Sequence, residues 1–412
     1  MDAIISLFLI LFLSYSLSLL FNKINIPKLL APIILGLIFS STNFYIGKEA
    51  LFSITFIKDI AIIFLMFFVG LKINLKHFFK SSKKSILIAT FASLLPFFFG
   101  FFGIQIAYKL GFLNYFIFNS NNLLIISYIV GICLSVTAEV VLIEILEELQ
   151  ILKSSIGETI IESGLVDTII GVLLLTGVVM FLPTSSYHSF SIPLKITIRI
   201  FEILIFTLLL YLLGKFILPK LMKEIESNKS KDIDYFTLSI IITLFLAVLS
   251  TQFDFGGSIL GAIFSGIIIK HTLLKGDKLE IKEEHHLTKI IEITTFGFFA
   301  PFFLFWIGLN SNLEVLFLNP FLSIFLIILA FSGKFLGSYL GNFLAKGNKK
   351  EGIIIGFGMN TKGEVDIMVA TLIYSLGFFG KELFSSLIFM SLITTLISPI
   401  FFKYLIKKHN KS

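Results

Sequence analysis

The feature that most constrains this chain is a series of long apolar runs, which recur from Ser6 to Ile406 with only short polar breaks between them. An α-helix needs about 20 residues to span a bilayer. Inside lipid every backbone polar group must find a partner within the protein, and these runs lack the alternating pattern of a membrane barrel strand. Charged residues make up 14% of the chain, against about 25% in soluble domains. The sequence therefore predicts an all-α polytopic membrane protein.

About thirteen helical spans account for these runs. The first run has neither a basic start nor a small-residue cleavage site, so we expect a retained helix rather than a signal peptide. Few residues follow the last run and no glycine-rich phosphate-binding turn occurs, so we expect one membrane domain over 1–412 without a soluble C-terminal domain. The expected spans are 3–21, 27–42, 50–70, 85–110, 122–147, 155–182, 197–218, 233–250, 256–271, 290–309, 317–345, 352–375 and 382–405.

The lysines lie mostly in the breaks and mostly on one side of the expected membrane. With the N-terminus outside, the external breaks hold only Lys48, Lys109, Lys195, Arg199 and Lys381. The positive-inside rule then predicts a cytoplasmic C-terminus, in a chain of the inner or plasma membrane. Lysines that face anionic lipid head groups explain the net charge of +7, so membrane lipid is an expected partner and nucleic acid is not.

Several chemistries find no support in the sequence. The single cysteine, Cys133, lies inside a span and has no partner for an intrachain disulfide. The run Glu283-Glu284-His285-His286 lies in a charged connector without the spacing of a zinc hydrolase, so we expect a solvated loop there. No nucleophile and base stand out, so neither an enzyme nor a cofactor is expected.

Polar and ionisable side chains in the middle of four spans are the candidates for function. Charges at this depth are costly in lipid and indicate function by default, although static buried ion pairs are the alternative. The candidates are Thr137 and Glu139 in the fifth span, Glu162, Asp167 and Thr168 in the sixth, Lys334 in the eleventh, and Asn360, Lys362, Glu364 and Asp366 in the twelfth.

Asp167 is the most specific candidate. A carboxylate about twelve residues into a span can bind a dehydrated cation or a proton. Lys334 can neutralise this carboxylate when it is empty, and an arriving cation must then displace the lysine. A purely structural pair of Asp167 with Lys334 is the alternative.

Two spans in opposite halves of the chain carry polar breaks. At Thr137 and Glu139 an unwound segment could offer carbonyl and hydroxyl oxygens to an ion, or Glu139 could pair locally. In the twelfth span Lys362 and Asp366 are spaced i to i+4 and could neutralise each other, whereas Glu364 shares a second polar stripe with Asn360. Interrupted helices in both halves are typical of a midplane substrate site between inverted repeats.

Four short motifs follow one another along the chain, FFVGLKINL at 67–75, FFLFWIGL at 302–309, GKFLG at 333–337 and GMNTKGE at 358–364. They resemble the motifs of the cation:proton antiporter-2 family, which includes NapA-type sodium/proton antiporters and Kef-type potassium/proton systems. The resemblance covers nearly the whole chain. It implies a homodimer with a dimerisation panel mainly at 1–80 and 197–272, and a moving core mainly at 85–182 and 317–405 in which two broken helices cross.

The chain departs from this family at the aspartate pair of the sixth span. Aligning GETII at 157–161 without gaps puts Asp167 on the first position of the pair and Thr168 on the second. An offset of one residue would put Val166 first and Asp167 second. In either alignment one carboxylate of the pair is missing, and Asp366 from the crossing helix is the first candidate to replace it.

The resemblance and the buried charges together predict exchange of a monovalent cation, Na+ first or else Li+ or K+, for H+ by alternating access. Asp167 is the expected transient Na+ site, with Lys334 as its competing partner and Thr137 and Thr168 as oxygen donors. The expected supporting residues are Glu139, Glu162, Asn360, Lys362, Glu364 and Asp366. Two alternatives stay open, a transporter of the same architecture for another solute such as an anion, and a non-transporting membrane sensor.

Overall fold

A computed structural model describes residues 3–23, 26–42, 47–73, 81–112, 123–179, 192–226, 231–252, 258–273, 278–314, 320–375 and 377–409. Within these ranges the chain forms helices and no strand. The first half contains α1 (Ala3–Lys23), α2 (Leu30–Ser41), α3 (Lys48–Lys72), α5 (Lys83–Lys109), α6 (Leu123–Ser135), α7 (Glu139–Glu148), α8 (Ser155–Val179) and α9 (Ile192–Leu212). The second half contains η3 (Leu213–Ile217), α10 (Leu218–Glu226), α11 (Lys231–Gln252), α12 (Ser258–Leu273), α13 (Lys278–Thr294), η4 (Thr295–Phe299), α14 (Ala300–Asn310), α16 (Pro320–Leu344), α17 (Lys349–Gly358), α18 (Glu364–Ser375) and α19 (Lys381–His409).

The apolar helices confirm a polytopic, all-α membrane protein. Among the described residues nine helices are long and apolar enough to cross a membrane. Four shorter apolar helices, at Leu30–Ser41, Leu123–Ser135, Ser258–Thr272 and Val365–Ser375, have 10–17 residues each. The count of thirteen spans stays a prediction.

The charged connector expected before residue 290 is a helix instead. α13 begins at Lys278 and runs through the π-helical turn η4 into α14 without a gap. The side chains of Glu283, Glu284 and His285 lie outside the described ones, but His286 meets Asp232 at 3.2 Å and both are more than half exposed. A charged sequence can continue a membrane helix into water because its polar side chains stay solvated there.

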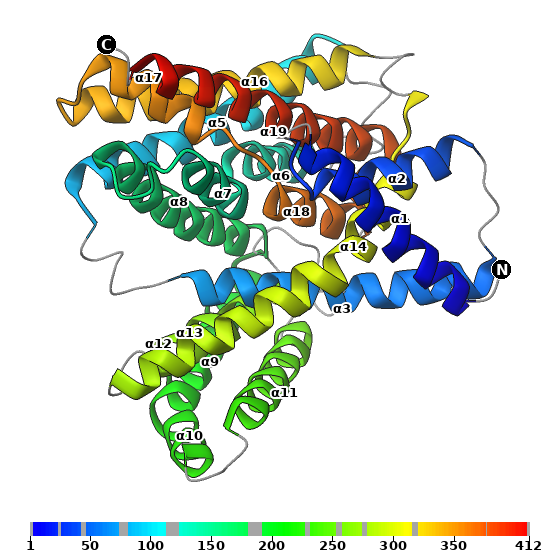
Figure 1. Ribbon diagram of the computed structural model, residues 1–412, viewed down its shortest axis with the longest axis vertical. Coiled ribbons are helices and arrows are strands. Elements are labelled where there is room, and N and C mark those ends of the chain that lie inside the picture. Colours follow the sequence, from blue (N-terminus) through cyan, green and yellow to red (C-terminus); the bar gives the residue numbers. More distant parts are fainter. Residues whose placement is uncertain are drawn as a thin grey trace. The chain divides into compact units, whose positions relative to one another are not determined.

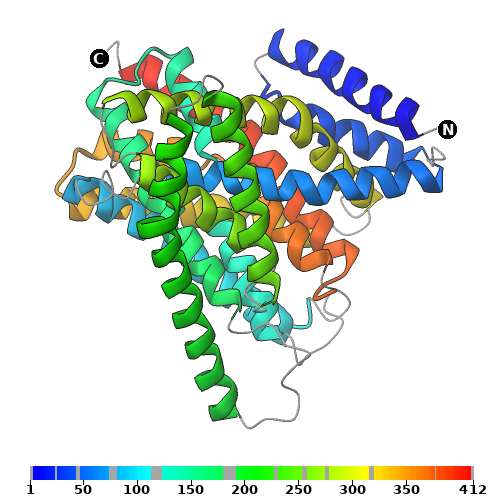
Figure 2. The ribbon, with the colours of Figure 1, turned by 90° about the horizontal axis from the view of Figure 1, so that it is seen from below.

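The chain divides into two compact units, and each has its own close helix contacts. Unit 1 comprises 1–54, 77–175 and 304–412, and unit 2 comprises 55–76 and 176–303. In unit 2, Gly70 of α3 and Gly266 of α12 face each other so closely that a Cβ on either would lie within 2.4 Å of the other helix's backbone. Figure 2 shows in green the continuous helix that α9, η3 and α10 form.

In unit 1, α5 and α16 pack along most of their length (Figure 1). Gly333, Gly337 and Gly341 recur every fourth residue on α16, and a Cβ on each would lie 2.2–2.6 Å from atoms of the α5 backbone. Small residues at this spacing let membrane helices approach closely. The contact brings Lys334, next to Gly333, toward the middle of α5.

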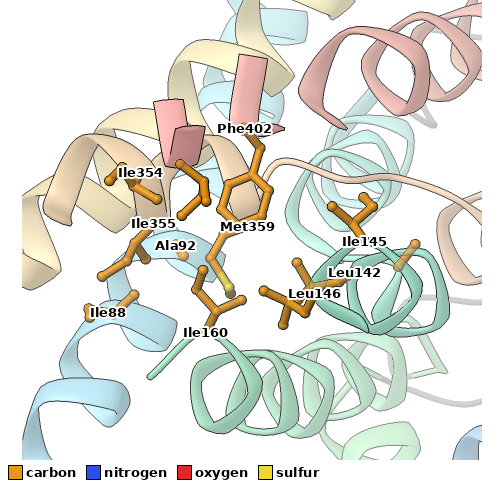
Figure 3. Packing of buried hydrophobic residues seen from close by; sticks show 12 residues of the cluster. Ile88, Ala92, Leu142, Ile145, Leu146, Ile160, Ile354, Ile355, Met359 and Phe402 are labelled. Carbon is orange, nitrogen blue, oxygen red and sulfur yellow. The ribbon is translucent and has the colours of Figure 1, made fainter. Parts of the chain in front are cut away.

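An apolar cluster lies on one side of the two broken helices of unit 1 (Figure 3). Ile88 and Ala92 from α5, Ile160 from α8 and Phe402 from α19 surround Met359, the residue that follows α17. The cluster also includes Leu142, Ile145 and Leu146 of α7 and Ile354 and Ile355 of α17. The half-helices α7 and α17 are therefore held by apolar packing.

Candidate ion site

The two predicted breaks are present, and they meet. α6 ends at Ser135 and α7 begins at Glu139, while α17 ends at Gly358 and α18 begins at Glu364. The Ala138 N–H donates to the Thr361 carbonyl at 3.0 Å, and the Thr137 hydroxyl donates to the Met359 carbonyl at 3.2 Å. Backbone groups freed by a break inside a membrane need partners within the protein. Each break supplies partners to the other, so the crossing is hydrogen-bonded.

Asp167 lies fully buried on α8 beside this crossing, and its carboxylate accepts three hydrogen bonds. Oδ1 accepts from Lys334 Nζ at 2.7 Å and from the Ser93 hydroxyl at 2.5 Å. Oδ2 accepts from the Thr137 N–H at 3.1 Å. Asp167 and Lys334 both have side chains with no exposed area. A buried ion pair loses much of its Coulomb energy to desolvation, so its partners are suited to exchange rather than to stability alone.

The Lys334 ammonium also donates to the Ser135 carbonyl, at the end of α6. A single positive charge thus lies between a carboxylate oxygen and a main-chain carbonyl oxygen. The Ser135 hydroxyl is buried without a hydrogen-bond partner among the described residues. Oxygens of this kind are the ligands that hard cations use in proteins, so this position can accept a metal cation in place of the ammonium.

Lys362, in the second break, binds the same half-helix. Its ammonium donates to the carbonyls of Cys133 at 3.3 Å, Leu134 at 2.5 Å and Val136 at 2.7 Å. The last carbonyls of a helix have no intrahelical partner and form the negative end of its dipole. Lys362 therefore closes the carbonyl end of α6, and its supporting role stays a prediction.

Lys362 and Asp366 do not lie one turn apart on a helix, as considered from the sequence, although their buried charges still act on each other. The helix α18 begins only at Glu364, so Lys362 precedes it, and no ion pair joins the two side chains in the described part of the chain. Asp366 Oδ1 accepts from the Gly363 N–H at 2.8 Å. A carboxylate in the first turn that bonds back to the residue before the helix is half of a capping box.

Glu162 does not lie at the centre of the buried site. Its Oε2 accepts at 3.1 Å from the N–H of Ser82, which caps the start of α5. Glu162 is therefore level with a helix end, about 1.4 turns along α8 from Asp167. Sequence spacing alone could not show this, because it depends on how far α5 extends beside α8.

The remaining candidates are distributed around the second break. The Asn360 side-chain Nδ2 donates to the main-chain carbonyl of Phe331 on α16 at 3.1 Å, and the main-chain carbonyl of Asn360 accepts from the Ser398 hydroxyl of α19 at 3.0 Å. Thr168 is buried on α8 next to Asp167. The side chains of Glu139 and Glu364 lie outside the described ones.

Ser93 is the residue at this site that sequence reasoning missed. It is 1% exposed, in the middle of α5, and contacts Asp167 directly. A lone serine in an apolar span has no distinguishing pattern, because such residues usually bond to the preceding turn of their own helix. Only the approach of α5 to α8 shows its role.

A buried carboxylate and lysine at the crossing of two interrupted membrane helices define a secondary ion transporter. The family model for the transmembrane region of sodium/hydrogen exchangers matches residues 7–408. The chain therefore belongs to the sodium/hydrogen exchanger family, and it is a multi-pass membrane protein that exchanges ions.

Relatives of known function and a solved structure are similar over nearly the full length. A Na(+)/H(+) antiporter of Enterococcus hirae is 26% identical over 394 residues, with 94% of each chain covered. The Na(+)/H(+)-K(+) antiporter GerN of Bacillus cereus is 23% identical, with 93% of this chain and 90% of that protein covered. The structure of the sodium proton antiporter MjNhaP1 from Methanocaldococcus jannaschii at pH 8 has a TM-score of 0.69 at 16% identity, with 98% of both chains covered. The antiporter fold expected from the sequence is confirmed.

Proposed function

We propose that this chain exchanges a monovalent cation, sodium first, for protons by alternating access, with Asp167 as the group that binds the cation. The observation that supports this role most directly is the fully buried pair of Asp167 and Lys334, 2.7 Å apart between the unwound ends of two helices. A charge removed from lipid in this way is costly unless it has a function. We propose Na+ as the first candidate among the cations because sodium appears in the names of both the family and the relatives.

In this mechanism the cation takes the position of the Lys334 ammonium. It binds Asp167 Oδ1 and the Ser135 carbonyl, the two oxygens that Lys334 contacts. Lys334 gives up its proton as it leaves, so that no second positive charge remains beside the cation. When the cation departs on the other side, Lys334 takes a proton and returns to Asp167. Thr137 and Lys362 keep the two breaks in place during the exchange.

The larger arrangement belongs to the same proposal. We assign dimerisation to the panel mainly at 1–80 and 197–272, and translocation to the core mainly at 85–182 and 317–405, which the family resemblance supports. The lysine distribution supports an external N-terminus and a cytoplasmic C-terminus in the inner or plasma membrane. A homodimer in that membrane is the form in which transport should be measured.

Replacement of Asp167 by asparagine tests this function. The amide keeps the shape of the side chain but carries no charge and cannot titrate. In proteoliposomes we expect Asp167→Asn to abolish the proton flux that a sodium gradient drives, monitored with a pH-sensitive dye, while the protein elutes as a folded species.

The control is Asp232→Asn, the same change at a carboxylate that is 54% exposed at the start of α11, where flux should stay near wild type. Wild-type proteoliposomes without any cation-dependent proton flux would refute the exchange itself. Near-normal flux in Asp167→Asn would move the binding group to another carboxylate.

A further inference from the structure

The Ser93 hydroxyl has one proton and two acceptors for it. Its Oγ lies 2.5 Å from Asp167 Oδ1 and 2.8 Å from the carbonyl of Ala89, one turn earlier on α5. A serine hydroxyl donates a single hydrogen bond and has two lone pairs that accept. The proton can therefore point to only one of these oxygens at a time, and the other direction is available without any movement of the backbone.

The cation that occupies the site beside Asp167, the Lys334 ammonium or a metal ion, decides which acceptor receives the proton. With Lys334 in place Asp167 is an anion, and a hydroxyl donates more strongly to a charged oxygen than to a neutral carbonyl. When a metal cation binds Asp167 Oδ1, its positive charge repels a Ser93 hydroxyl proton that points toward the same oxygen. Rotation about the Cβ–Oγ bond turns that proton to Ala89, the bond that buried helical serines ordinarily make. The lone pairs of Oγ then face the cation.

The packing of α5 against α16 holds Ser93 in this position. Gly333 contacts Pro96 so closely that a Cβ added to Gly333 would lie 2.6 Å from the Pro96 Cα. Pro96 follows Ser93 by three residues and Lys334 follows Gly333 by one, so this contact sets both side chains beside Asp167. The same carboxylate oxygen accepts from both.

We infer that Ser93 is a ligand of the transported cation, an oxygen donor that completes a site with Asp167 Oδ1 and the Ser135 carbonyl. This inference rests on the proposed function and deepens it. The three oxygens come from α5, α8 and the end of α6, and all belong to buried residues. Ser93 thus supplies an oxygen to a site where, among the described side chains, Asp167 is the carboxylate that hydrogen-bonds Lys334. A hydroxyl, a carbonyl and a carboxylate suit a hard monovalent cation.

The test compares Na+ with Tl+, a soft monovalent cation, in three variants. Ser93→Ala removes the oxygen, and Ser93→Cys replaces it by sulfur at nearly the same position. Ser338→Ala is the matched control, because Ser338 is also buried and, within the described part of the chain, its hydroxyl donates to the carbonyl one turn before it, that of Lys334, at 2.9 Å. The KM for Na+ is measured from proton flux in proteoliposomes. The affinity for Tl+ is its inhibition constant against Na+-driven flux, which reports binding whether or not Tl+ is carried.

We expect Ser93→Ala to raise the KM for Na+ roughly tenfold or more, because the loss of one contact with a charged group has an effect of this size. The same variant should weaken Tl+ inhibition as well. Ser93→Cys should raise the KM for Na+ similarly but keep Tl+ inhibition near wild type, because sulfur prefers soft metals. Ser338→Ala should leave both constants unchanged.

Equal losses for Na+ and Tl+ in Ser93→Cys would overturn the inference, since Ser93 would then only position Asp167. An unchanged KM for Na+ in Ser93→Ala would overturn it too, while the proposed function would stand as long as Asp167→Asn is inactive. If Ser93→Ala does not fold, the comparison of the two cations in Ser93→Cys decides alone.

Discussion

At the scale of single residues, two buried lysines lie at the carbonyl end of α6, with different partners. Lys334 contacts a carboxylate and one carbonyl, so its departure leaves a site with charge and oxygen for a cation. Lys362 contacts three carbonyls and no carboxylate among the described side chains. Its departure would leave three buried acceptors without donors. We therefore interpret Lys334 as the exchanged partner and Lys362 as a fixed support.

This difference predicts that Lys362→Met destabilises the protein. Each buried carbonyl left without a donor costs about 1–3 kcal/mol, so the thermal unfolding temperature should fall by several degrees. The fluorescence of Trp306, the single tryptophan, buried in unit 1, can follow unfolding in lipid nanodiscs.

The control is Lys350→Met, which removes an exposed lysine from the first turn of α17 and should leave the unfolding temperature unchanged. A Lys362→Met protein as stable as wild type would mean that the carbonyls find other donors.

At the scale of helices, the site depends on how closely α5 and α16 approach. Lys334 and Ser93 come from these two helices and meet at one oxygen of Asp167. The glycines of α16 allow that approach, since they present no side chain to the α5 backbone. A methyl group at this contact must push the helices apart, because the nearest atoms are backbone and cannot turn aside.

Gly337→Ala is therefore expected to reduce both stability and transport. The new methyl carbon would lie 2.2 Å from the Phe91 carbonyl oxygen, and overpacking of this kind costs about 1–3 kcal/mol. Thermal unfolding and sodium-dependent proton flux should both decline. Gly297→Ala is the control, because a Cβ at Gly297 would have no described atom within 4 Å outside its own stretch of helix. Equal behaviour of the two variants would mean that α16 does not need this close contact.

At the scale of the whole molecule, the number of charges that change determines whether voltage affects transport. Asp366 bonds to the start of its own helix and Lys362 to carbonyls, so Asp167 and Lys334 are the groups whose occupancy changes in the proposed cycle. The cation-bound site contains ionised Asp167, the cation and neutral Lys334. The returning site contains ionised Asp167 and protonated Lys334. Both have zero net charge.

One cation is therefore expected to exchange for one proton, without net charge movement. A charge crossing the full membrane field would feel about 2.3 kcal/mol per 100 mV. The membrane potential of the proteoliposomes is clamped at several values with potassium and valinomycin. The sodium gradient that stops proton flux is measured at each potential. A balance point independent of potential is expected. One that moves with potential would show that another carboxylate, Asp366 first, takes part.

The sequence by itself determined the membrane class, the two interrupted helices and the candidate pair of Asp167 and Lys334. These features are local, because the length of an apolar run, a polar break in it and the depth of a charge can be counted along one segment. The motifs added the family, which the match over residues 7–408 confirms.

Tertiary structure alone decided which side chains meet across helices. It placed Ser93 against Asp167, turned Lys362 to the carbonyl end of α6, made Asp366 a helix cap and moved Glu162 to the level of a helix end. These contacts depend on the rotation and offset of packed helices, which small residues far apart in the sequence set by close approach. No count along a single span contains that information.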